Sequence, residues 1–195
     1  TGLYMSVIVR PECDAETAAM ITTAAAVAAA ESVELLCGHR TDIKWVNDLY
    51  INGRKICGIL TEASMSMETM SMDYAVIGIG INVRSVKDIF DAELLKRASS
   101  IEDETGVIPD RNRLCAGIVN RLERVLGELE SREFLAEYRR REILTGHTVT
   151  ATVGNEVITA EAIGIDDNAN LIVRTSDGTE RHLGSGEANL CRISE

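Results

Sequence analysis

The 195-residue chain has little basic charge, few aromatic residues and only two prolines. It contains 20 Lys and Arg against 31 Asp and Glu, which gives a formal net charge of -11. Binding to a nucleic-acid backbone needs clustered Lys and Arg, so we do not expect this portion to hold DNA or RNA. No unbroken apolar run approaches the roughly 20 residues that a membrane-spanning helix requires, which argues against an integral membrane protein.

Cysteine and histidine form no recognisable disulfide or metal pattern. The five cysteines are odd in number, widely spaced and include no CxxC pair. This usage suits a reducing compartment, so it predicts a cytoplasmic protein without a disulfide framework or a zinc site. The apolar fraction of 45% and the charged fraction of 26% are typical of a globular protein with one domain, or with one larger and one small domain.

Local patterns predict an α+β first domain over residues 1–144. Asp14 is a candidate N-cap for an Ala-rich helix that runs to Cys37, with Gly38 as its end. Asn52-Gly53 is a strong two-residue hairpin signal between two apolar runs. The stretch 64–71 is rich in methionine and predicts a loop. Strands are expected over 3–9, 43–51, 55–63 and 73–83, and further helices over 91–98, 111–130 and 131–144.

A second, smaller domain is predicted over residues 145–195. Short alternating runs over 148–153, 157–165 and 171–175 are separated by turn residues such as Gly154-Asn155 and Asp177-Gly178. This pattern favours a small β-barrel or sandwich of about 50 residues.

The hairpin around Asn52-Gly53 carries the richest candidate chemistry. The chain has only four lysines, and two of them, Lys44 and Lys55, lie within its apolar runs. If the first strand is straight, strand period two places Lys44, Asp48, Tyr50 and Lys55 on one face. Two cations and a carboxylate could neutralise an anionic substrate there. The alternative is a solvated hairpin face with an ordinary ion pair.

A second candidate lies at the end of the apolar run 73–83. Gly78 and Gly80 alternate along it, which removes side chains from one face and lets a flat ligand or another backbone approach. Asn82 then offers both hydrogen-bond donors and an acceptor. The segment is not a dinucleotide fingerprint, because the third glycine and the following helix are missing. Tight strand packing is the alternative interpretation.

In combination, these segments resemble the catalytic domain of biotin–protein ligases. Lys44–Tyr50 reads KWVNDLY, Arg54–Leu60 reads RKICGIL and Gly78–Asn82 reads GIGIN, against the family pattern KWPND…RK.(A/C)GIL…G.GIN. The resemblance implies an α+β fold, a mixed sheet packed with helices of the class II synthetase-like type, followed by an SH3-like barrel. Val46 replaces the usual proline. The family's Gly/Arg-rich loop would precede Thr1, so the chain is expected to be about the C-terminal two-thirds of such an enzyme.

The resemblance implies ATP-dependent attachment of biotin to a lysine of a biotin carboxyl carrier protein, through biotinyl-5′-AMP. The implied catalytic residues are Lys55, Lys44 and Asp48. The residues expected to bind biotin are Lys55, Gly58, Ile59, Gly78 and Gly80, and those expected to bind ATP are Asn82, Lys44, Asn47 and Ile81. Mg²⁺ would arrive with ATP, with Asn82 as its one candidate neighbour.

Two alternatives remain open at this point. One is a relative that binds biotin for regulation without catalysis, and the other is a ligase for lipoate or octanoate. The resemblance also allows a homodimer through a sheet edge. It further suggests that the polar loop from Arg84 to about Glu93 is mobile without ligand and closes over the adenylate.

Overall fold

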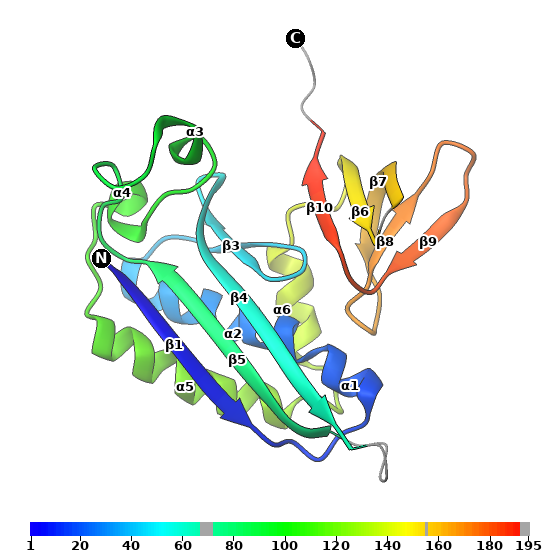
Figure 1. Cartoon of the computed structure of the whole chain (residues 1–195), viewed down its shortest axis with the longest axis horizontal. Helices are drawn as coiled ribbons and strands as arrows, with labels where there is room; N and C mark the ends of the chain where they lie inside the picture. The colour runs from blue at the N-terminus through cyan, green and yellow to red at the C-terminus, as the bar shows by residue number, and fades with distance from the viewer. Residues whose placement is uncertain (67–71, 155, 192–195) are drawn as a thin grey trace.

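The computed structural model describes residues 1–66, 72–154 and 156–191 (Figure 1). A five-stranded sheet in the order β1-β5-β4-β3-β2 forms the first domain. Its strands are antiparallel to their neighbours, and they are β1 (Gly2–Val9), β2 (Asp42–Lys44), β3 (Asp48–Ile51), β4 (Arg54–Met65) and β5 (Met72–Asn82). The mixed sheet implied by the resemblance is therefore wrong, because parallel pairing in the described residues is limited to two isolated bridges, Ile43 with Glu142 and Lys55 with Ala98. Most of the methionine-rich stretch lies outside the described residues.

Helices cover one face of this sheet only (Figure 1). The predicted Ala-rich helix is present, but it is divided at Met20 into α1 (Ala15–Ala19) and α2 (Ile21–Cys37). Helix α2 packs against β2, β3 and β4 on one side and against α5 (Arg111–Gly127) and α6 (Phe134–Arg141) on the other. Every residue from Ala24 to Ala30 is fully buried, because the small side chains let the helix sit between these layers.

The stretch Ala15–Cys37 is long and apolar enough to cross a membrane by length and composition, and it is the one described helix of that kind. Glu and Thr residues interrupt its apolar residues, so this stretch contains no unbroken apolar run of that length. In the structure, 72% of its most apolar window is buried inside the protein. Core packing between the sheet and two helices therefore accounts for its composition.

The remaining helices of the first domain are short. Helix α3 (Ala92–Leu95) occupies part of the predicted segment 91–98, and α4 (Ile101–Thr105) was not predicted. Helices α5 and α6 are both shorter than expected from the sequence. Between them, Arg132 takes a positive φ of 60°, which a continuing helix does not allow.

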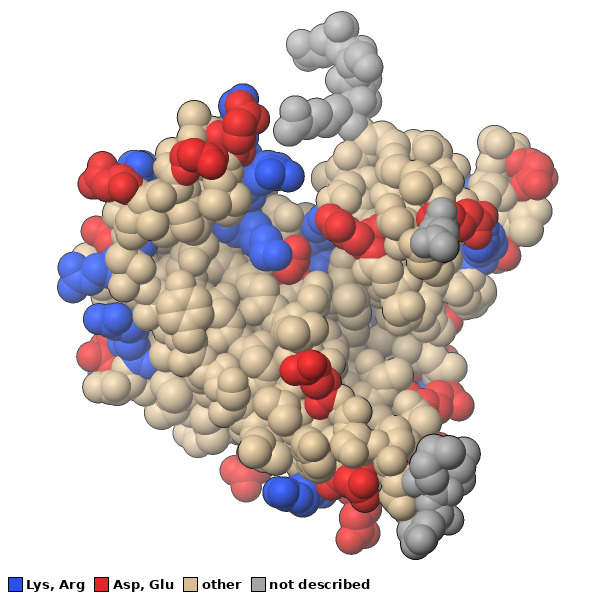
Figure 2. All heavy atoms as spheres, in the orientation of Figure 1, with Lys and Arg blue, Asp and Glu red and all other residues tan. Residues whose placement is uncertain are grey.

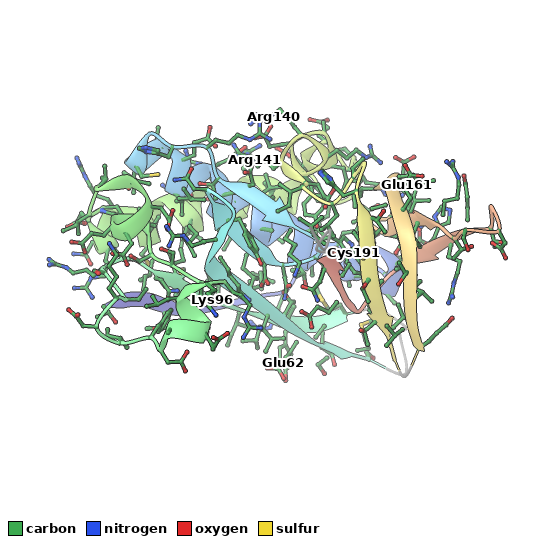
Figure 3. All side chains as sticks on the ribbon, turned by 90° about the horizontal axis from the view of Figure 1, so that it is seen from above. Glu62, Lys96, Arg140, Arg141, Glu161 and Cys191 are labelled. Atoms are coloured by element: carbon green, nitrogen blue, oxygen red, sulfur yellow. The ribbon has the colours of Figure 1, made fainter. Side chains whose placement is uncertain are left out.

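The second domain is a five-stranded antiparallel sheet in the order β10-β6-β7-β8-β9. The three predicted strands appear as β6 (Thr148–Val153), β7 (Glu156–Ile165) and β8 (Leu171–Arg174). Two more, β9 (Glu180–Leu183) and β10 (Glu187–Leu190), complete it. Figure 1 shows β10 as the strand of this domain nearest to β3 and β4, and in Figure 3 Cys191, just after β10, lies between the two domains.

The face of the first sheet that carries no helix is open to solvent. Leu60 is 63% exposed and Tyr4 is 75% exposed on this face. Seen from above, Glu62 of β4 points away from the helical layer, while Arg140 and Arg141 of α6 lie on the opposite side (Figure 3). A ligand can therefore approach the sheet from this face.

Candidate functional site

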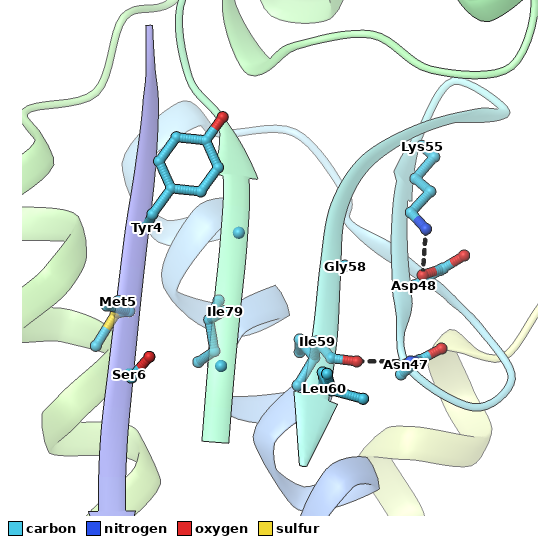
Figure 4. A pocket seen from close by; sticks show the side chains of 12 residues that line it. Tyr4, Met5, Ser6, Asn47, Asp48, Lys55, Gly58, Ile59, Leu60 and Ile79 are labelled. Carbon is cyan, nitrogen blue, oxygen red and sulfur yellow. Dashed lines mark hydrogen bonds and ion pairs between the residues drawn. The ribbon is translucent and has the colours of Figure 1, made fainter. Parts of the chain in front are cut away.

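A cavity of about 560 Å³ lies on the open face of the first sheet (Figure 4). Strands β4 and β5 form its floor, and β1 and the turn before β3 form its two walls. Its lining residues are Tyr4, Met5, Ser6, Asn47, Asp48, Lys55, Gly58, Ile59, Leu60, Gly78, Ile79 and Gly80.

Glycines make the floor of the cavity flat. Gly58 and Gly80 are direct partners across β4 and β5, and Gly78 lies two residues further along β5 on the same face. The intervening Ile79 is 2% exposed and belongs to the core, so it contributes only backbone to the cavity. A Cβ on Gly80 would lie 3.5 Å from the ring of Tyr4, which leans over this floor.

An ion pair closes one end of the cavity. Lys55 Nζ lies 2.6 Å from Asp48 Oδ1 (Figure 4). Both groups stand over Gly58, because a Cβ there would be 3.5 Å from Lys55 Nζ and 3.7 Å from Asp48 Oδ1. Their side chains remain 40% and 19% exposed, so a ligand on the glycine floor can reach them.

Lys44 joins this end by a different route from the one predicted. The expected single strand 43–51 is wrong, because a turn at residues 45–47 separates β2 from β3. Lys44 is therefore directly opposite Asp48 instead of four residues along the same strand. Directly paired residues share a face, so the predicted common face of Lys44, Asp48, Tyr50 and Lys55 survives.

The turn is held by contacts from three directions. Asn47 Nδ2 donates to the Ile59 carbonyl at 2.6 Å, and the Ile59 amide donates to the Asn47 carbonyl at 3.1 Å (Figure 4). Trp45 Nε1 donates to the Ala169 carbonyl of the second domain at 3.1 Å. Tyr138 Oη of α6 donates to the Val46 carbonyl at 3.1 Å, and the Trp45–Val46 peptide bond is cis.

Charges of both signs meet where the two domains face each other (Figure 2). Lys44 is only 8% exposed, and this burial lowers its pKa, against the opposing effect of Asp48 and Glu187. Burial, together with the same two carboxylates, raises the pKa of Tyr50 to about 12. Tyr50 is therefore a neutral hydrogen-bonding group at physiological pH, and the lysines are the cations available to an anionic ligand.

Residues 1–82 match the biotin/lipoate A/B protein ligase family, and residues 145–190 match the biotin protein ligase C terminal domain. The chain belongs to the biotin protein ligase family.

Individual members of the family are similar along most of the chain. The bifunctional ligase/repressor BirA of Bacillus spizizenii is 33% identical over 188 residues, which are 92% of this chain and 56% of that protein. The biotin–[acetyl-CoA-carboxylase] ligase of Paracoccus denitrificans is 29% identical over 181 residues, 90% of this chain and 75% of that protein. The chain thus spans little more than half the length of the BirA relatives.

Solved structures of the family have the same fold. Biotin protein ligase from Aquifex aeolicus superimposes with a TM-score of 0.82 at 25% identity, covering 98% of this chain and 82% of that one. The α+β architecture with a C-terminal sheet domain, inferred from the sequence, is confirmed by this likeness.

Three of the residues that the sequence assigned to the ligase site lie outside the cavity lining, namely Lys44, Asn82 and Ile81. Asn82 continues the glycine face of β5 beyond the cavity, and its Nδ2 donates to the Ser99 carbonyl at 2.9 Å. The side chain of Ile81 is fully buried in the core, so only its backbone can meet a nucleotide. Gly58, Ile59, Gly78 and Gly80 all line the cavity, as do Asn47, Asp48 and Lys55.

Five lining residues and one partner of Lys44 were not predicted as site residues. Two of the five, Leu60 and Ile79, belong to segments that the resemblance covers but were given no role. Tyr4, Met5 and Ser6 of β1 form the far wall, because β1 pairs with the glycine strand and places Tyr4 beside Gly80. The alternation along β1 could have suggested an exposed face, but no motif there marks a ligand site. Asn189 on β10 was also missed, and its Oδ1 accepts a hydrogen bond from Lys44 Nζ at 2.6 Å.

The loop after β5 is attached to helix α4 at its beginning. Asp103 accepts hydrogen bonds from Ser85 Oγ at 2.8 Å and from the Val86 amide at 2.9 Å. Further along, Ile89 is 58% exposed. Closure of the segment 84–93 over a ligand stays a prediction, and these contacts make Val86 the point from which it would move.

Proposed function

We propose that this chain carries the biotin-adenylating site of a biotin protein ligase, and that the complete enzyme attaches biotin to a lysine of a biotin carboxyl carrier protein. In the first step a biotin carboxylate oxygen attacks the α-phosphorus of ATP, and pyrophosphate leaves. In the second step the amine of the carrier lysine attacks the carbonyl carbon of biotinyl-5′-AMP, and AMP leaves. The observation that carries the proposal is a glycine-floored cavity that ends at the Lys55–Asp48 pair.

The floor suits a flat bicyclic ligand. With no side chains on Gly78 and Gly80, the rings of biotin can lie directly against the strand backbones, with Tyr4 at their side. A variant of the Aquifex ligase was solved in complex with biotin, and it shares this fold with a TM-score of 0.81 at 25% identity. With its rings on this glycine floor, biotin would direct its carboxylate end toward Lys55.

The charged end suits the adenylation step. Two anions, a carboxylate and a triphosphate, must approach each other, so cations have to offset their repulsion and the charge that develops on phosphorus oxygens. In this proposal Lys55 bridges the biotin carboxylate and the α-phosphate, and Lys44 lies behind Asp48 toward the second domain. Orientation alone can supply roughly 7–11 kcal/mol of the barrier reduction.

Asp48 has two roles in this proposal. Before the first step its carboxylate fixes the Lys55 ammonium over Gly58. In the second step it is the nearest carboxylate that can accept a proton from the attacking carrier amine, because it lines the same cavity. Asn47 and the backbone of Ile81 would contact the nucleotide, in line with the family resemblance.

Magnesium would enter with ATP. The described residues contain no group of three or more His, Cys, Asp or Glu side chains that could hold a metal ion. Mg²⁺ in nucleotide enzymes commonly uses one or two protein oxygens together with phosphates and water. The side-chain amide of Asn82 supplies an oxygen of that kind on the glycine face, and the ion would supply charge neutralisation for the phosphates.

Biotin-dependent exchange between ATP and labelled pyrophosphate tests the proposal. It should be measured on this chain and on the full-length gene product, with octanoate and lipoate in place of biotin as substrate controls. Lys55→Ala in the full-length protein should reduce exchange at least 10²-fold, because a charged transition-state contact is lost. Lys55→Arg should also fail, since a planar guanidinium does not replace a compact ammonium at a bridging position.

Lys96→Ala is the matched control, because Lys96 is an exposed lysine paired only with its helix neighbour Glu93 among the described residues. Its exchange rate should equal that of the unmodified protein. Activity of Lys55→Ala within about threefold of that rate would make the assignment of Lys55 wrong. Exchange with octanoate or lipoate alone would change the substrate class, and biotin binding without exchange would favour a regulatory relative. The proposal also places the enzyme in the cytoplasm and allows a homodimer through the edge strand β1.

A further inference from the structure

We infer that Asn189 of the C-terminal domain is a positioning residue for the adenylation site, because its amide oxygen holds the Lys44 ammonium at the domain junction without cancelling its charge. The inference rests on the proposed function and extends it to a residue of β10. Among residues 1–66, 72–154 and 156–191, the one hydrogen bond of Lys44 Nζ goes to Asn189 Oδ1, at 2.6 Å.

The two lysines of the site are held in opposite ways. Lys55 faces the carboxylate of Asp48 at 2.6 Å, so its charge is balanced before any substrate arrives. Within the described part of the chain, no carboxylate lies within 4.0 Å of Lys44 Nζ. A neutral amide satisfies one ammonium hydrogen and leaves the full positive charge available to an incoming anion. Lys44 is therefore the better-prepared site for an extra phosphate charge.

The orientation of the Asn189 amide is fixed by its second contact. Asn189 Nδ2 donates to Glu187 Oε1 at 3.0 Å. An ionised carboxylate only accepts hydrogen bonds, so the nitrogen of the amide must face Glu187 and the oxygen must face Lys44. The Asn189 side chain therefore contacts both Glu187 and the Lys44 ammonium. The Glu187 carboxylate attracts Lys44 through this side chain without forming an ion pair with it.

Burial gives this arrangement a measurable signature. Lys44 is 8% exposed, and the charged groups that face it are Asp48 of β3, Lys55 of β4 and Glu187 of β10. Burial and the like charge of Lys55 disfavour the ammonium, while the two carboxylates favour it. The balance lowers the pKa of Lys44, so a change in its neighbour should move that pKa in a direction fixed by the charge introduced.

The decisive variant is Asn189→Asp in the full-length protein, which keeps the size of the side chain and adds a negative charge. It should raise the pKa of Lys44, because an opposite charge favours the ammonium. It should also raise the KM for ATP about tenfold, as expected for the loss of one charge-assisted contact, with the KM for biotin unchanged. Asn189→Ala should raise the KM for ATP without raising the pKa. Asn120→Asp, on the exposed face of α5, is the charge-matched control and should change neither quantity.

The pKa is measured by NMR titration of the full-length protein with lysines labelled at the side chain, and Lys44→Arg identifies the signal from Lys44. An unchanged Lys44 pKa in Asn189→Asp would overturn the inference, because the pair would then not exist in solution. A shifted pKa with an unchanged KM for ATP would also overturn it, since Lys44 would not serve the phosphates. If the unmodified protein catalyses no biotin-dependent exchange, the proposed function fails, and equilibrium binding of ATP replaces the KM in the same comparison.

Discussion

The flat floor of the cavity makes a clear prediction for the single substitution Gly78→Ala. Gly78 has ordinary strand backbone, since it is absent from the described residues with positive φ. A Cβ added there would meet only the Leu60 carbonyl oxygen, at 3.5 Å, which is normal van der Waals contact. The strand can therefore accept alanine without moving, and the new methyl group projects into the space where a ligand would lie.

The expected size of the effect follows from this geometry. A methyl group extends about one C–C bond, roughly 1.5 Å, above the floor and lifts a flat ligand by on the order of 1 Å. A displacement of that size at a reacting centre can cost about 10²-fold in rate, which corresponds to about 2.7 kcal/mol of transition-state stabilisation. Folding stability should stay equal or rise by up to about 0.5–1 kcal/mol, because glycine weakens a strand interior relative to alanine.

The assay compares kcat/KM for biotin-dependent pyrophosphate exchange with urea unfolding of the same preparation. Gly127→Ala at the exposed end of α5 is the control, because its Cβ would have no neighbour within 4 Å. It should leave exchange unchanged. Exchange by Gly78→Ala within threefold of the unmodified protein would mean that the ligand does not lie on this floor. A loss of stability as large as the loss of activity would mean that β5 cannot accept the methyl group.

Two further predictions concern charged side chains away from the cavity. The side chain of Arg141 is 3% exposed and pairs with Glu34 and Glu137. Arg141→Met should therefore lower the free energy of unfolding, measured in urea, by about 3–5 kcal/mol. The control Arg140→Met, at a side chain 51% exposed, should lower it by less than about 1 kcal/mol. For Asp103, burial raises the pKa, but hydrogen bonds, foremost from the Val86 amide, outweigh it and hold the pKa at about 2. Its stabilising contribution should therefore be complete above about pH 4 and fade as the pH falls toward 2, so stability of Asp103→Asn should vary less over that range in acid titrations followed by circular dichroism.

The turn at residues 45–47 marks the limit of strand prediction in this chain. The run Ile43–Ile51 is rich in apolar, aromatic and β-branched residues, which favours one continuous strand, although its alternation breaks at Trp45-Val46 and Asn47-Asp48. Asn47 and Asp48 are residue types common in turns, but Val46 is β-branched and stands where the family has proline, so the local signal for a reversal is weak. The reversal depends on contacts from β4, α6 and the second domain, which no short window of sequence contains. The common face of the charged residues was nevertheless predicted, because strand alternation and direct pairing give the same side.

Long-range contacts also explain what the sequence did not reveal about the rest of the site. The glycines of β5 and the Lys55 strand were found because their spacing is local and unusual for a strand. Tyr4 enters the cavity only through the pairing of β1 with β5, and Asn189 only through the position of β10. Strands β9 and β10 are four residues each and lie among glycine and charged residues, so their alternation is too short to detect.

The second domain contributes to the chemistry proposed here through position. The turn that separates Lys44 from Asp48 donates a hydrogen bond from Trp45 Nε1 to the Ala169 carbonyl of the second domain, and its Val46 carbonyl accepts one from Tyr138 Oη of α6. Reacting groups must be held to within a fraction of an ångström, so a rigid turn between the two residues is a direct requirement of the site. Because the second domain holds one side of this turn and also supplies Asn189 to Lys44, a shift of that domain would move Lys44 and the turn relative to the glycine floor. Loss of activity after changes in the second domain would therefore follow even where no residue of that domain touches biotin.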